Sequence, residues 1–109
     1  MQGIKFDSEK ADLSFIRLDA IEQIAKVFMY GAKKYSRGNY LAGMNHTRLL
    51  AAAGRHLFAY ISGEDLDQES GQSHLAHLGC CTLMLLTYKA KNLGVDDRDM
   101  SEPLTDPKK

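Results

Sequence analysis

The chain lacks tryptophan altogether, and its 109 residues include only two cysteines and two prolines. The cysteines are neighbours, Cys80 and Cys81, and a regular helix does not readily bridge two residues that point about 100° apart. We therefore expect two buried thiols in a reducing cytoplasm rather than a disulfide framework. Acidic and basic residues balance, so no overall field attracts nucleic acid or an anionic membrane.

Long apolar runs are also missing. The sequence has no stretch of about eighteen apolar residues, so no membrane-spanning helix is expected, and the N-terminus lacks the apolar segment of a signal peptide. There is no P-loop, no glycine-rich dinucleotide fingerprint, no cysteine-based zinc pattern and no nucleophile elbow. These absences leave metal-assisted hydrolysis as the best candidate chemistry.

Apolar residues recur with helical spacing in three segments, which we expect to be helices over residues 18–30, 47–62 and 73–92. No run of alternating apolar residues suggests a sheet, so the predicted fold is an all-α bundle. The third segment is apolar on nearly every side and must be buried on all of them. Since a bundle of three helices of this size cannot bury the third helix on all sides, we expect a homodimer or homotetramer. Residues 1–95 are assigned to one helical domain and the charged residues 96–109 to a flexible tail.

Polar residues at the expected helix ends suit those positions. Asp19 followed by Glu22 resembles a capping box at the start of the first helix. Gly31 can adopt the left-handed conformation that often follows a helix, so it is expected to end that helix. Asn45 or Thr47 is expected to cap the second helix.

The segment around the start of the third helix concentrates groups that bind divalent metals. Glu64, Asp67 and Glu69 precede His74 and His77, which are three residues apart and therefore share one helical face. Carboxylates suit Mg²⁺ and Mn²⁺, and Mn²⁺ also accepts imidazole. These five residues predict a site for Mg²⁺ or Mn²⁺. The alternative is a solvated acidic loop that caps the helix.

Two further residues with suitable chemistry lie on the second helix. His56 falls on its inner stripe, and since this helix leads into the acidic loop, His56 can face His77 across a helical hairpin. The alternative is a core histidine with one satisfied hydrogen bond. Arg55 is a suitable phosphate ligand because its planar guanidinium matches phosphate oxygens.

A third group combines basic and aromatic residues between the first two helices. Lysines suit phosphates, and an aromatic ring can stack on a base, although a solvated basic surface is the alternative. The residues expected to bind a nucleotide are Lys33, Lys34, Tyr35, Asn39, Tyr40 and Arg55, with Lys5 and Lys10 of the N-terminal arm.

Together these segments resemble a family of small phage proteins described as dATP/dGTP diphosphohydrolases, relatives of the MazG-type all-α nucleotide pyrophosphohydrolases. The resemblance covers roughly residues 4–90 and is carried by the segments 5–7 with Lys10, 30–35 with 39–40, 55–57, 63–71 and 74–77. It implies a MazG-like helical oligomer that uses Mg²⁺ or Mn²⁺. Such an enzyme hydrolyses deoxynucleoside triphosphates, with dGTP and dATP favoured, to the monophosphate and pyrophosphate.

The sequence departs from the MazG pattern at the metal ligands. Where typical MazG proteins carry glutamates and an aspartate on two successive helices, this chain has alanines followed by His56, and then His74 and His77. Asp67 or Glu69 is expected to be the base for the attacking water, with His56 and His77 as the other catalytic residues.

The departure also keeps a second interpretation open, namely a catalytically inactive nucleotide-binding or helical adaptor module. As a hydrolase of free nucleotides, the protein would act on small molecules rather than on nucleic acids or membranes. It would then be cytoplasmic, in the host cell if a phage encodes it.

Overall fold

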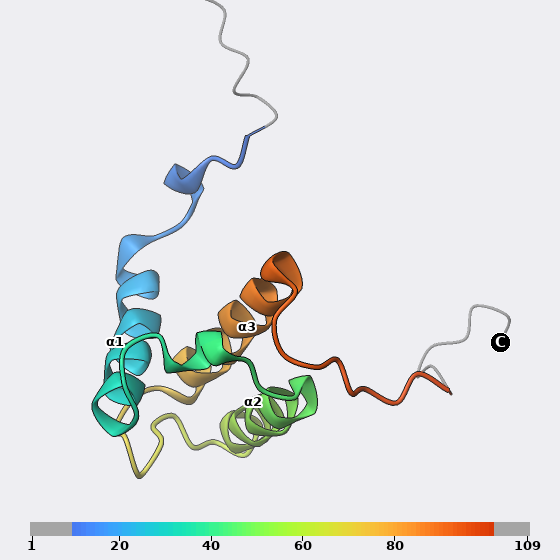
Figure 1. The fold of residues 1–109 in the computed structure, drawn as a ribbon. Coiled ribbons are helices and arrows are strands. Elements are labelled where there is room, and N and C mark those ends of the chain that lie inside the picture. The colour runs from blue at the N-terminus through green and yellow to red at the C-terminus, as the bar shows by residue number, and fades with distance from the viewer. Residues whose placement is uncertain (1–9, 102–109) are drawn as a thin grey trace, which may run out of the picture.

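The computed structural model describes residues 10–101, and helices are their main secondary structure (Figure 1). The α-helices are α1 (Leu18–Lys34), α2 (His46–Ile61) and α3 (His74–Lys91), and the 3₁₀ helices are η1 (Leu13–Phe15) and η2 (Asn39–Ala42). Within this part of the chain, β pairing is limited to two isolated bridges. The predicted all-α fold is therefore confirmed.

The first helix is longer than its periodicity predicted. The expected end at Tyr30 is wrong, because α1 continues through Gly31 to Lys34. One glycine inside a helix costs about 1 kcal/mol, and the alanine and two lysines that follow it are strong helix formers. The ends of α2 and α3 each lie one residue from the predicted bounds.

Two of the three α-helices begin without the side-chain cap that was expected. Arg17 is the N-cap of α1, and its guanidinium donates to Asp19, so the predicted capping box does not form. At α2 the Asn45 side chain makes no capping hydrogen bond. Ser73, in contrast, caps α3, since its hydroxyl accepts hydrogen bonds from the amides of Leu75 and Ala76.

The start of α2 is capped from the other end of the chain. Asp97 accepts hydrogen bonds from the Thr47 amide at 2.9 Å and from the Thr47 hydroxyl at 2.6 Å. Next to it, the His46 amide donates to the Val95 carbonyl at 2.9 Å. Residues that follow α3 are thus bound to α2, although the predicted boundary between domain and tail after residue 95 stays a prediction.

The helix α3 packs against both α1 and α2 (Figure 1), and the hydrophobic core lies between α3 and α1. The core residues are Val27, Ala76 and Cys80, with Ile24, Phe28 and Met84 packed against them. Cys80 and Cys81 are both free and buried, and burial raises the pKa of the Cys80 thiol to about 12. The Cys80 side chain is therefore protonated at neutral pH and acts as a small apolar group.

Much of the apolar surface of the single chain is exposed. On α3, the side chains of Leu75, Leu83 and Leu86 are all exposed, although this helix was expected to be buried on every side. No helix within residues 10–101 has both the length and the apolar character needed to cross a membrane.

Candidate functional site

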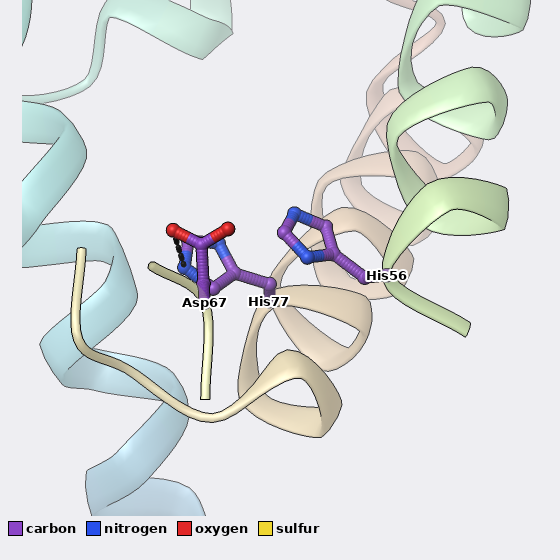
Figure 2. Close-up of side chains that lie close together, drawn as sticks. All are labelled: His56, Asp67 and His77. Carbon is purple, nitrogen blue, oxygen red and sulfur yellow. Dashed lines mark ion pairs between the residues drawn. The ribbon is translucent and has the colours of Figure 1, made fainter. Parts of the chain in front are cut away.

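Three side chains of types that can hold a metal ion lie together where the α2–α3 hairpin joins its connecting loop (Figure 2). His56 comes from α2, Asp67 from the loop and His77 from α3, and one ligand atom of each lies within 4.8 Å of the others. The imidazole rings are stacked, with centroids 4.3 Å apart and planes 9° apart. Asp67 Oδ2 lies 4.0 Å from His77 Nε2. Two imidazoles and a carboxylate form a donor set suited to a divalent transition metal.

The turn around Asp67 holds its carboxylate in this group. The Ser70 amide donates to Asp67 Oδ2, and the Gly71 amide donates to the Asp67 carbonyl, both at 2.8 Å. Gly71 has a φ of 72°, which residues with a side chain rarely adopt. Ser70 Oγ also lies 2.7 Å from His77 Nε2, so one turn positions both the carboxylate and the imidazole.

The electrostatics favour the protonation states that bind metal ions. Burial lowers the pKa of the His56 and His77 imidazoles. Burial also acts to raise the pKa of the Asp67 carboxyl, but the hydrogen bonds from Ser70 and the two imidazoles together bring it below its usual value. At neutral pH the group therefore consists of two neutral imidazoles and one carboxylate, which is what a divalent ion requires.

Two residues predicted as metal ligands do not lie beside Asp67: His74 contacts His56, and Glu64 contacts His74. His74 is only 4% exposed, and its Nδ1 lies 2.8 Å from Nδ1 of His56. Its Nε2 lies 2.6 Å from Oε1 of Glu64. Both ring nitrogens of His74 are therefore occupied by protein groups, and neither His74 nor Glu64 belongs to the three-residue group.

Glu69 is close to the group but is bound to α1. Its Oε1 accepts hydrogen bonds from Lys34 Nζ and from the Tyr30 hydroxyl, both at 3.1 Å. The bond from Lys34 and that from Tyr30 hold the pKa of the Glu69 carboxyl below its usual value. Lys34, which was expected to bind phosphate, is thus paired with a carboxylate that was expected to bind metal.

A groove with a volume of about 560 Å³ contains the three-residue group. Four of the predicted nucleotide-binding residues also line it, namely Lys34, Tyr35, Asn39 and Arg55. Arg48 lines the groove as well and was not predicted from the sequence. Tyr30 and Ser70, which belong to the surrounding hydrogen-bond network, lie in the segments 30–35 and 63–71 but were given no role in the site. The spacing of seven residues between Arg48 and Arg55 puts both on one helical face, and this signal was available in the sequence.

A smaller, mainly apolar hollow of about 320 Å³ adjoins the groove and shares Val27, Gly31, Asn39 and Met84 with it. Tyr40 lines the hollow and packs on Phe28, with ring centroids 5.4 Å apart. The hydroxyl of the fully buried Tyr88 donates to the Tyr40 carbonyl at 2.6 Å, which holds η2 against α3.

The remaining predicted substrate residues lie elsewhere. Lys33 is exposed and lines neither the groove nor the hollow. Lys10 is exposed in the N-terminal arm, and Lys5 lies outside the described residues.

Comparisons with known proteins agree on one family. The family described as "dATP/dGTP diphosphohydrolase, N-terminal" matches residues 1–98. A dATP/dGTP diphosphohydrolase of Salmonella phage PMBT28 is 37% identical over 101 residues, which cover 93% of this chain and 34% of the relative. The chain thus spans about a third of the length of that relative. No solved structure matches the chain.

Proposed function

Because the chain belongs to the dATP/dGTP diphosphohydrolase family, we propose that it hydrolyses purine deoxynucleoside triphosphates, in a metal-dependent reaction, to the monophosphate and pyrophosphate. The observation that carries this proposal is the composition of the groove. His56, Asp67 and His77 lie within 4.8 Å of one another in a cavity that Arg48 and Arg55 also line. Hydrolysis of a phosphoanhydride needs metal-binding and phosphate-binding groups in one place.

We assign the metal ion to His56, Asp67 and His77. The carboxylate is compatible with both Mg²⁺ and Mn²⁺, whereas the two imidazoles favour Mn²⁺. When bound, such an ion supplies positive charge for the phosphate oxygens and lowers the pKa of a water molecule.

We assign the other residues of the groove to the phosphates, to the attacking water and to the base of the nucleotide. Arg48 and Arg55 would bind phosphate oxygens, since each guanidinium offers a planar pair of donors. Glu69, whose carboxyl is ionised at neutral pH, would accept the proton of the attacking water, as would Asp67 if its second oxygen stays free. Tyr40 and the adjoining hollow would hold the base.

The direct test is an assay of phosphate release, with pyrophosphatase added, over the common deoxynucleoside and nucleoside triphosphates in Mn²⁺ and in Mg²⁺. We expect turnover of dGTP and dATP that stops when the metal is chelated. Nucleotide-dependent thermal stabilisation without turnover would instead support a binding module. The absence of both turnover and thermal stabilisation would support a helical adaptor.

We further propose that the chain forms a homodimer or homotetramer, as in the MazG-like architecture that the resemblance implies. Phe58 and Ile61, one turn apart on α2, are 68% and 65% exposed, and Leu57 beside them is also exposed. A contiguous apolar surface of this kind marks an interface. Light scattering is expected to give the mass of a dimer or tetramer.

The same measurement on the double variant Phe58→Glu/Ile61→Glu is expected to give a monomer, because two buried charges would oppose association. The matched control is Lys26→Glu, an exposed change of charge on α1. A monomeric unchanged chain at micromolar concentration would contradict the proposed oligomer.

A further inference from the structure

A hydrogen-bonded chain of three side chains runs from the surface to the candidate metal group. It begins at Glu64, whose side chain is 43% exposed, and passes through His74, whose side chain is 5% exposed. It ends at His56, and its two links measure 2.6 Å and 2.8 Å. No step of the proposed hydrolysis uses Glu64 or His74.

The chain has a defined direction because its outer end is a pure acceptor. An ionised Glu64 carboxylate can only accept a hydrogen bond, so His74 donates from Nε2. A neutral imidazole carries one proton, which leaves His74 Nδ1 as an acceptor. With His74 in this neutral form, the bond between the two histidines is donated by His56 Nδ1. Consequently His56 Nε2 carries no proton, and its lone pair is free.

We infer that Glu64 and His74 are positioning residues, which fix the tautomer of His56 so that its Nε2 can bind the metal ion of the proposed site. The inference rests on the proposed function for the identity of the group that His56 serves. Its physical basis is general. A metal-binding imidazole is oriented by the partner of its other ring nitrogen, and here that partner is a second imidazole held by a carboxylate.

The position of Glu64 makes the inference testable without unfolding the protein. Since its side chain is partly exposed, Glu64→Ala removes the acceptor but leaves no buried cavity. Glu64→Gln keeps a carbonyl oxygen that can accept from His74 Nε2 and is expected to restore the wild-type tautomer. Asp65→Ala is the matched control, because this neighbouring acidic side chain makes no hydrogen bond within residues 10–101.

The first measurement is the protonation of each imidazole nitrogen in the metal-free protein, by long-range ¹H–¹⁵N correlation spectroscopy. We expect the proton of His56 on Nδ1 in the unchanged protein, in Glu64→Gln and in Asp65→Ala, and a mixture of tautomers in Glu64→Ala. The second is the affinity for Mn²⁺ by calorimetry, which we expect Glu64→Ala to lower by roughly tenfold to a hundredfold.

A proton on His56 Nε2 in the unchanged protein would overturn the inference, as would a Glu64→Ala variant with unchanged tautomer and unchanged Mn²⁺ affinity. Equal losses of Mn²⁺ affinity in Glu64→Gln and Glu64→Ala would overturn it in favour of Glu64 as a direct ligand. The tautomer needs neither metal nor nucleotide to be observed. If the tautomers and Mn²⁺ affinities are as expected but the protein turns over no nucleotide, the proposed hydrolysis is therefore refuted while the positioning role of Glu64 and His74 stands.

Discussion

Asp67→Asn is expected to lower the turnover number for dGTP on the order of a thousandfold, because it removes the only anionic member of the proposed metal group. Asparagine keeps the shape of the side chain and an oxygen that can accept the hydrogen bond from the Ser70 amide. The turn should therefore persist while the charge is lost. Steady-state kinetics with dGTP, together with calorimetric titration of Mn²⁺, measure the two consequences separately.

Two other substitutions show whether the effect is specific. Asp65→Asn removes the same charge from the same loop and is expected to leave turnover and Mn²⁺ affinity unchanged. Arg48→Ala removes a proposed phosphate ligand and is expected mainly to raise the KM for dGTP, on the order of tenfold. If Asp67→Asn kept its turnover number within a few-fold of the unchanged enzyme, the proposed metal group would be wrong.

Gly94→Ala is expected to lower the free energy of unfolding by about 3 kcal/mol, for two reasons that act together. Gly94 has a φ of +69°, a conformation that alanine rarely adopts. A methyl group there would also collide with the carbonyl oxygen of Met44. The backbone cannot easily move away, since the next residue, Val95, accepts the hydrogen bond from the His46 amide. Urea unfolding followed by circular dichroism measures the loss.

Gly63→Ala separates the two causes. Gly63 also has a positive φ, of +97°, but a methyl group there would meet nothing within 4 Å. We expect the free energy of unfolding of this variant to fall by about 1 kcal/mol, because only the backbone conformation is unfavourable for alanine. Equal losses in the two variants would show that the close approach between Gly94 and Met44 contributes nothing to stability.

The positions of the helices and the class of the fold were predictable from local patterns. The spacing of apolar residues indicated three helices. The cap of α3 was expected at Asp67 or Ser70 and is instead Ser73, which directly precedes the helix. The length of α1 was not predictable from Gly31, because a single glycine ends a helix only when the residues after it do not favour continuation. The cap of α2 was not predictable either, since Asp97 lies fifty residues away from Thr47.

For the candidate site, the sequence by itself determined which chemical groups are available, and the tertiary structure decided which of them meet. Carboxylates and imidazoles near the start of α3 were recognisable as metal-binding types, and the family resemblance followed from their order. Whether His56 or His74 joins Asp67 and His77 depends on how α2 packs against α3 and on the turn that Gly71 permits. Distances between side chains on different elements are set by packing, which no local spacing encodes.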